Sequence, residues 1–252
     1  MRPTHALRRI HFFLAVLTAL ALLAGPAAAE QAGAERVFRY ATAGDILGLD
    51  PHANNEGPTN AVKAEVYGAL LHRKPDLSLA PDLATSWERL GPTTWHFNLR
   101  QGVTFHNGNP FDADDVVYSF KRQRQESAEM RFAVATIKAV RKLDPHRVEI
   151  ETDGPDPILL LNLPYFFIVD REYMEANDAF AVVKGAGKAN FANTQANGTG
   201  PFKLVEWQPD SRLVLAPNRD WWNEAKRGDN LDRAVFTPIA NAATRVAALL
   251  SG

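Results

Sequence analysis

Hydrophobic and polar residues alternate along W-H-F-N-L at positions 95–99, which is the period of a strand with one buried face. Gln101-Gly102 interrupts the alternation, and Val103-Thr104-Phe105 resumes it. Asn107-Gly108 comes next, and this dipeptide is a strong turn signal because both residues tolerate positive φ angles. The pattern predicts two short strands separated by a break and followed by a tight turn.

A capped helix is predicted directly after this turn. Asp112 stands at the N-cap position, and Asp115 lies three residues further on, where a capping box places its second acidic side chain. Val116, Val117 and Phe120 supply the apolar face of the helix. Strands and helices thus follow one another closely, as in mixed α/β proteins.

The same reasoning predicts the other elements of the chain. Further strands are expected at residues 37–41, 148–151, 165–169, 202–207, 213–215 and 231–239. Helices are expected at residues 61–71, 158–163 and 242–250, and Asp170 is expected to cap one more. Pro81 suits the first turn of a helix. Residues 184–199 are rich in Gly, Asn and Ala, which favours a linker.

The first 29 residues have the pattern of a secretory signal peptide. Arg2, Arg8 and Arg9 precede an apolar run at residues 12–24, and Ala27-Ala28-Ala29 offers a cleavage site. The run is too short to cross a bilayer, and no later segment is long and apolar enough. We therefore expect general secretion, with a disordered leader at residues 30–36.

The net charge and the absence of cysteine exclude several classes of protein and of site. Of 28 basic and 29 acidic residues, three basic ones lie in the signal peptide, which leaves 25 against 29, or a net charge of −4. This balance gives no electrostatic footprint for nucleic acid. The chain has no cysteine, so disulfides, thiolate sites and a cysteine-linked lipid anchor are excluded.

Residues 95–116 also carry a family resemblance. W-x-F-x-L-R-x-G-V-x-F-H-x-G-x-P-x-x-A-x-D-V resembles the characteristic motif of the family 5 extracellular solute-binding proteins, the dipeptide, oligopeptide and nickel receptors of ABC importers. The matching positions for which the resemblance implies a structural role are Trp95, Phe97, Leu99, Arg100, Gly102, Phe105, His106, Gly108, Asp115 and Val116.

Shorter segments extend the resemblance over residues 37–252. They are L-D-P-H at 49–52, V-Y-x-x-L at 66–70, A-P-D-L-A-T-S-W at 80–87, and G-T-G-P-F at 198–202. The last contributes Gly198, Gly200, Pro201 and Phe202 as further expected structural positions. N-R-D-W-W at 218–222 resembles the family's N-x-x-Y-W segment.

The resemblance implies a type II periplasmic-binding-protein-like fold, α/β with mixed sheets, in two lobes with an extra inserted domain. Lobe I is expected at residues 37–71 and 197–252, and the inserted domain at residues 72–196. Family members are roughly twice this long, so the C-terminal lobe is expected to be missing after residue 252. Ligand is expected to bind between lobes that close by hinge bending.

By the same resemblance, Asn55, Glu56 and Gly57 line the ligand cleft and offer backbone groups to an extended peptide. The alternative is an ordinary surface loop. The implied function is a monomeric periplasmic receptor that captures di- or oligopeptides and delivers them to the permease of an ABC importer. Nickel, haem, opine and oligosaccharide ligands remain open within the family.

Motifs for catalysis are weak. There is no G-x-S-x-G or H-E-x-x-H, and acidic residues at a helix start, such as Asp112 and Asp114, more often cap than catalyse. The five histidines beyond the signal peptide lack metal-ligand spacing, so we expect no metal, no cofactor and no catalytic residue. A secreted hydrolase with an unrecognised site and a structural or chaperone-like secreted domain remain the alternatives from other classes.

Overall fold

The computed structural model describes residues 35–184, 190–223, 225 and 230–251, and the predicted signal peptide lies outside them. Residues 36–252 form one compact unit. Its strands are β1 (Val37–Thr42), β2 (Leu71–Arg73), β3 (Leu79–Pro81), β4 (Ala84–Arg89), β5 (Thr94–Leu99), β6 (Ile137–Asp144), β7 (Arg147–Thr152), β8 (Phe202–Gln208), β9 (Arg212–Pro217) and β10 (Arg233–Pro238). Its helices are α2 (Gly57–Val66), α3 (Ala113–Gln123), α4 (Leu159–Asn162), α5 (Arg171–Ala176), α6 (Phe191–Thr194) and α7 (Ala242–Ser251), with 3-10 turns η1 (Glu129–Val134) and η2 (Leu163–Tyr165).

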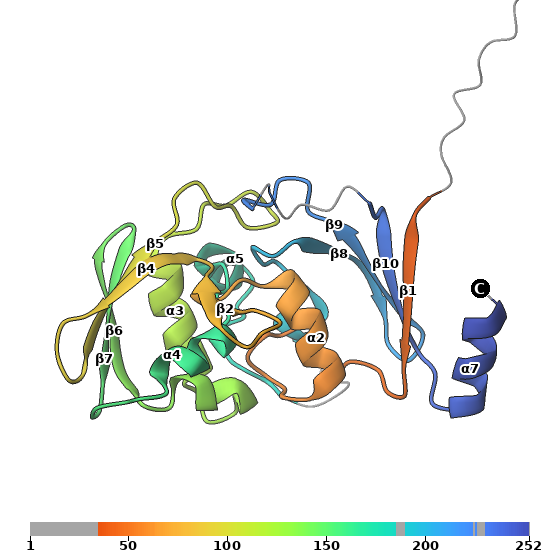
Figure 1. The fold of residues 1–252 in the computed structure, drawn as a ribbon, viewed down its shortest axis with the longest axis horizontal. Helices are drawn as coiled ribbons and strands as arrows, with labels where there is room; N and C mark the ends of the chain where they lie inside the picture. Colours follow the sequence, from red (N-terminus) through yellow and green to blue (C-terminus); the bar gives the residue numbers. More distant parts are fainter. Residues whose placement is uncertain (1–34, 185–189, 224, 226–229, 252) are drawn as a thin grey trace, which may run out of the picture. The chain divides into compact units, whose positions relative to one another are not determined.

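One mixed sheet has the strand order β1-β10-β9-β8. β1 runs parallel to β10, whereas β9 pairs antiparallel with both of its neighbours. Helix α2 covers one face of this sheet (Figure 1). Val62 and Val66 of α2 share a core with Leu213, Leu215 and Phe236 of the sheet, so burial of this helix face holds the layers together.

A second sheet, wholly antiparallel, has the order β4-β5-β7-β6 and packs against α3 (Figure 1). The alternation is confirmed at 97–99, where Phe97 and Leu99 are buried and Asn98 is exposed, whereas Trp95 and His96 are both half-buried. The predicted capping box of α3 is confirmed as well. The Asp112 side chain accepts from the backbone of the first turn, and the Asp115 side chain accepts from the Asp112 N–H.

Two predicted strands are not strands of a sheet. Residues 103–105 form only an isolated bridge, between Thr104 and Pro110 around the predicted Asn107-Gly108 turn. Residues 165–169 are largely buried, but they contribute a single bridge from Phe167 to Ala69. Backbone groups of residues 103–105 pair within their own turn, and those of residues 165–169 pair partly with side chains, such as Ser119 and Gln123 of α3.

Two helix predictions are wrong. The helix expected at 61–71 occupies Gly57–Val66, because Glu56 caps it and Pro58 suits its first turn. It ends at the extended residue Tyr67, and Leu71 pairs with Pro81 in the β2-β3 hairpin. Pro81 therefore closes a strand and begins no helix.

The expected division into lobe I and an inserted domain stays a prediction. The β1-β10-β9-β8 sheet draws its strands from residues 37–42 and 202–238, and the second sheet from residues 84–152. Part of the predicted linker forms α6, and residues 185–189 lie outside the described part of the chain. Within the described residues, no helix is long and apolar enough to span a bilayer.

Candidate functional site

The loop Asn55-Glu56-Gly57 leads directly into α2. Asn55 and Gly57 are exposed and Glu56 is half-buried. Glu56 has extended backbone angles, φ −138° and ψ 159°, and its carboxylate accepts from the backbone N–H and the hydroxyl of Thr59. The Glu56 side chain is thus engaged in capping, while its backbone has the geometry of a β-strand.

This loop has an unpaired backbone edge. Among the described residues, no hydrogen bond engages the carbonyl of Asn55 or the N–H groups of Glu56 and Gly57. A carbonyl and an N–H two residues apart in extended chain can pair with one residue of a parallel strand. The loop therefore offers a short, ready-made edge to an extended ligand.

A buried ion pair joins α3 to the segment that precedes the loop. Arg122 of α3 donates to both carboxylate oxygens of Asp50, at 2.7 and 2.6 Å, and both side chains are fully buried. Burial would raise the pKa of Asp50, but Arg122 and His52 hold this pKa below its ordinary value. Asp50 and His52 belong to the L-D-P-H segment, so the ion pair anchors that segment to α3.

His52 completes the cluster as a neutral imidazole. Its Nε2 lies 2.9 Å from the carbonyl oxygen of Phe167 and must donate, so Nδ1 accepts from Arg122 at 3.0 Å. Burial and the neighbouring Arg122 lower the pKa of His52 to about 3.

Asp170 connects the turn of the 95–116 motif to the segment before residue 198. Its Oδ2 accepts from the side-chain amides of Asn107, Asn109 and Asn197 at 2.8, 2.9 and 2.9 Å. Its Oδ1 accepts from the N–H of Tyr173 and so caps α5, as predicted. A carboxylate that accepts four hydrogen bonds is strongly held, so Asp170 fixes three segments together.

His106 makes a second link between the same segments. Its backbone N–H donates to Gly198 O at 2.8 Å, and its Nε2 lies 3.0 Å from Gly200 O. The Gly198 N–H in turn points at Nδ1 from 3.4 Å. Burial lowers the pKa of His106 to about 4, with a further contribution from Lys203. The ring is therefore neutral, with the proton on Nε2.

Gly198 and Gly200 lie where the chain crosses the C-terminal end of α2. A Cβ on Gly198 would lie 2.0 Å from the carbonyl oxygen of Val66, and one on Gly200 would lie 2.4 Å from that of Glu65. The Gly200 N–H donates to Val66 O at 2.9 Å and satisfies an otherwise free helix carbonyl. Only glycine allows so close an approach of two backbones.

The remaining motif positions pack in the core, lie at turns or contact other side chains. Phe97, Leu99, Phe105 and Val116 are buried in one core, and Trp95 packs against it. Gly102 and Gly108 have φ angles of +73° and +96°, which favour glycine. Asp115, Pro201 and Phe202 are buried or half-buried. The guanidinium carbon of Arg100 lies 3.9 Å from the ring centroid of Trp222, which is a cation–π contact.

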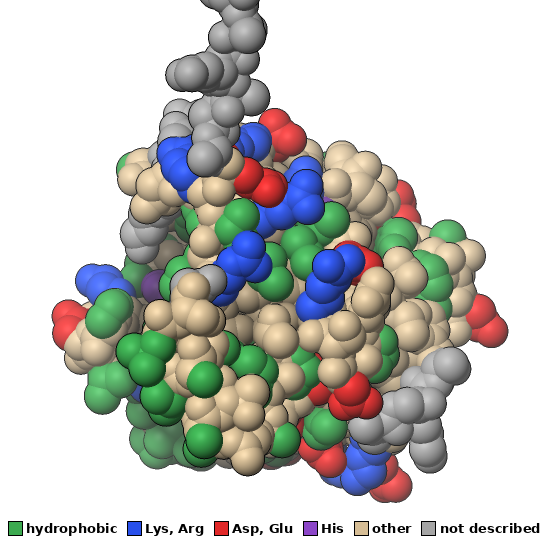
Figure 2. Space-filling model, turned by 90° about the vertical axis from the view of Figure 1, so that its right-hand side faces the viewer, with side chains coloured by type: hydrophobic (Ala, Val, Ile, Leu, Met, Phe, Trp, Pro, Cys, Tyr) green, Lys and Arg blue, Asp and Glu red, His purple; other side chains and the backbone are tan. Residues whose placement is uncertain are grey.

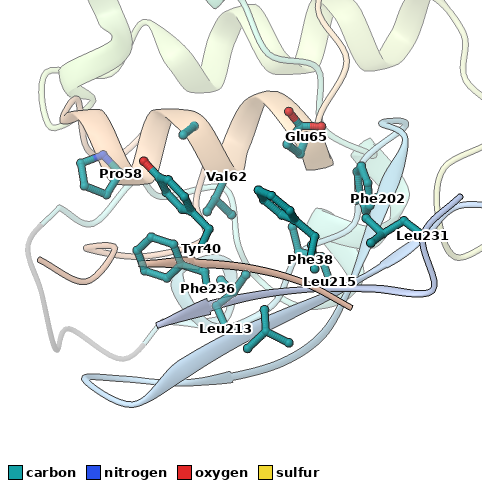
Figure 3. A pocket seen from close by; sticks show the side chains of 13 residues that line it. Phe38, Tyr40, Pro58, Val62, Glu65, Phe202, Leu213, Leu215, Leu231 and Phe236 are labelled. Atoms are coloured by element: carbon teal, nitrogen blue, oxygen red, sulfur yellow. The ribbon is translucent and has the colours of Figure 1, made fainter. Parts of the chain in front are cut away.

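An apolar groove of about 350 Å³ lies between α2 and the β1-β10-β9-β8 sheet. Phe38 and Tyr40 of β1 point towards Pro58 and Val62 of α2 across it (Figure 3). Phe38 and Tyr40 are 56% and 51% exposed, so the groove is open to solvent. Among the described residues, Glu65 is the one charged residue of its lining.

Helix α7 also presents apolar side chains to solvent. Val246, Leu249 and Leu250 are exposed, and no residue of this helix is buried. Figure 2 shows the molecule from the side on which α7 lies in Figure 1, with hydrophobic and basic side chains close together at the surface. Within the described chain, no group of three His, Asp or Glu side chains is placed to hold a metal ion.

Two charged residues next to the loop were not singled out from the sequence. Lys63 of α2 donates to the carbonyl of Asn54, and Glu129 of η1 accepts from the N–H of Asn55 at 2.9 Å. Lys63 lies one helical turn after Thr59, and its near-complete burial has no local sequence signal. Glu129 is 74 residues from Asn55 in the chain, so only the folded structure brings them together.

Comparison with known proteins gives consistent similarities. Residues 78–252 match the family model described as bacterial extracellular solute-binding proteins, family 5, middle. The chain is 31% identical over 245 residues to heme-binding protein A of Haemophilus influenzae, covering 88% of this chain and 43% of that protein. It is 29% identical over 237 residues to di/tripeptide-binding protein 3 of Pseudomonas aeruginosa, with shares of 84% and 43%.

A solved structure shows the same arrangement of elements. The ABC transporter-associated periplasmic binding protein DppA from Helicobacter pylori, in complex with the peptide STSA, aligns with a TM-score of 0.73 and 27% identity. The alignment covers 86% of this chain and 45% of that one. The chain thus spans less than half the length of the relatives it matches, and the expected type II fold with mixed sheets is confirmed for this part.

Proposed function

Because the chain belongs to family 5 of the bacterial extracellular solute-binding proteins, we propose that it binds short peptides in the periplasm for an ABC importer. The observation that carries the peptide ligand is the free backbone edge at Asn55-Glu56-Gly57. Relatives named for di- and tripeptides, and one solved with a bound peptide, support the same ligand class.

A backbone edge suits peptides because every peptide carries the same pattern of N–H and C=O groups. The Asn55 carbonyl and the Gly57 N–H would pair with one ligand residue, and this pairing is independent of the ligand's side chains. A receptor for many different short peptides needs such tolerance. Selectivity among them would come from groups outside this edge.

Capture and delivery require no bond to be broken. We assign no catalytic residue, and the Nε2 atoms of His52 and His106 donate to the backbone carbonyls of Phe167 and Gly200. Closure of two lobes over the ligand would create the form that docks on the permease, so the ligand would act by stabilising the closed state. The proposed partner is the permease, and the proposed receptor is a monomer.

Haem is the second candidate ligand, because a relative with 31% identity is named for haem binding. The two candidates are separated by titrating the complete purified gene product with trialanine and with haem in a calorimeter, with Ni²⁺ as a third ligand. We expect saturable heat with trialanine and an unchanged peptide afterwards by mass spectrometry. Binding of haem alone, or hydrolysis of trialanine, would overturn the peptide proposal.

A further inference from the structure

We infer that Lys63 and Glu129 are positioning residues that together fix a single peptide group, the one that joins Asn54 to Asn55. The Lys63 ammonium donates to its carbonyl oxygen. The Glu129 carboxylate accepts from its N–H at 2.9 Å. The same amide is therefore held at both ends by charges of opposite sign, and such charge-assisted hydrogen bonds are stronger than neutral ones.

Glu129 is held in place by the backbone on either side of it. Its own N–H donates to Ala53 O at 3.2 Å, and the Met130 N–H donates to His52 O at 3.3 Å. Met130 is completely buried, which anchors the start of η1 in the core. The carboxylate of Glu129 thus reaches Asn55 from a fixed backbone, although the side chain itself is partly exposed.

Lys63 is 1% exposed and approaches from the opposite side of the loop, on the second turn of α2. Burial lowers its pKa to about 8, and attraction from Asp50, Glu56 and Glu129 opposes that shift. Its Nζ also lies 3.5 Å from Asn60 Oδ1, and Asn60 Nδ2 donates to Asn55 Oδ1 at 2.8 Å. The side chain of Asn55 is therefore fixed together with its backbone.

The fixed peptide plane sets the positions of the N and Cα atoms of Asn55. The hydrogen bond from Asn60 to the Asn55 side chain then sets the direction of the Asn55 Cβ and so restricts φ of this residue, which limits where the Asn55 carbonyl and the Glu56 N–H can point. These groups begin the free edge. The role of the pair in ligand affinity rests on the proposed function, whereas its role in ordering the loop does not. A pre-ordered edge binds more tightly because less entropy is lost on binding.

The ordering role is tested by amide hydrogen exchange, measured by NMR on the wild-type chain and on E129A, E129Q and E126A. Glu126 is an exposed neighbour and serves as the matched control. We expect the Asn55 amide to be protected in the wild type and in E126A, and to exchange about tenfold faster or more in E129A. E129Q, which keeps an acceptor oxygen, should restore part of this protection. Equal exchange rates in all four proteins would overturn the inference.

The role of Lys63 is tested at the Asn54 carbonyl, which is the acceptor end of the same peptide group. Loss of a hydrogen bond to a carbonyl moves its ¹³C resonance, so Lys63→Met should shift the Asn54 carbonyl signal relative to the wild type. The cooperative thermal transition of the variant shows that the fold is intact. An unmoved Asn54 resonance in a folded Lys63→Met protein would remove Lys63 from the pair.

Binding measurements with trialanine separate this inference from the proposed function. We expect E129A to bind trialanine about tenfold more weakly at a nearly unchanged melting temperature, with E129Q in between and E126A like the wild type. Unchanged affinity in E129A, despite faster exchange at Asn55, would overturn the link to binding. Failure of the complete wild-type gene product to bind trialanine would count against the peptide proposal, and the exchange data would then decide the ordering role alone.

Discussion

Arg122 and Asp50 form a fully buried, bidentate ion pair between α3 and the segment that precedes the candidate binding loop. Arg122→Met would leave the buried Asp50 carboxylate with the backbone N–H of His52 as its remaining donor, and would remove the donor to His52 Nδ1. Breaking one partner of such a pair costs about 3–5 kcal/mol, and we expect a loss of that size in the free energy of unfolding. Urea unfolding measures it.

Arg131→Met is the matched control for this change, because Arg131 is exposed on η1. A surface substitution of this kind should change the free energy of unfolding by no more than about 0.5 kcal/mol. A loss below about 1 kcal/mol in Arg122→Met would show that the ion pair contributes little to the fold.

His106 should make stability depend on pH. Its pKa is about 4 in the folded protein and about 6.5 in the unfolded chain, so the unfolded chain binds more protons between these values. The stability gained by keeping His106 neutral is complete above pH 6.5 and is lost as pH falls towards 4. The loss is at most about 1.4 kcal/mol per pH unit in this window.

Comparison with His106→Gln isolates this contribution, because other titrating groups are common to both proteins. Asp115, for example, has its pKa raised to about 7 by burial and acts in the opposite direction. The wild type should lose more melting temperature than His106→Gln between pH 6.5 and 4. Parallel pH profiles of the two proteins would show that the protonation of His106 is not coupled to folding.

Gly198→Ala should prevent stable folding. The added Cβ would lie 2.0 Å from the carbonyl oxygen of Val66, which is backbone and cannot rotate away. Gly44→Ala is the matched control, since no atom lies within 4 Å of a Cβ built there. We expect Gly44→Ala to melt within a few degrees of the wild type. A cooperative melt of Gly198→Ala at the same temperature would mean that the crossing over α2 is less rigid than described.

The apolar groove beside β1 should bind the dye ANS, because exposed apolar grooves of this kind take up such ligands. Phe38→Ser should weaken the fluorescence at little cost in melting temperature, since Phe38 is 56% exposed. Leu77→Ser is the control, because Leu77 is 69% exposed but lies outside the groove. Equal dye fluorescence in the two variants would place the bound dye elsewhere.

Local sequence signals predicted much of the fold. The capping box of Asp112 and Asp115, the cap at Asp170 and the Asn107-Gly108 turn depend on neighbouring residues, and the structure confirms them. The helix expected at 61–71 was misplaced because its cap, Glu56, is an uncommon N-cap residue. Residues beyond Tyr67 were apolar enough to continue the helical pattern, yet Leu71 pairs with Pro81 instead.

Contacts between distant residues explain what the sequence did not predict. The Arg122–Asp50 pair joins residues 72 positions apart, and the amides around Asp170 come from up to 63 positions away. No periodicity encodes such pairings. The resemblance to a known family drew attention to Asn55, Glu56 and Gly57, but Lys63 and Glu129 became visible only once the fold placed them at the same peptide group.

The measurement that tests the peptide proposal most directly compares Gly57→Pro with Gly57→Ala in a titration with trialanine. Proline at this first helical position removes the free N–H, and the extended Glu56 before it suits proline, so the fold should persist. Alanine keeps the N–H and meets no atom within 4 Å. We expect wild-type affinity in Gly57→Ala and an affinity about tenfold lower in Gly57→Pro. Equal affinities in the two variants would contradict recognition of a peptide through this backbone edge.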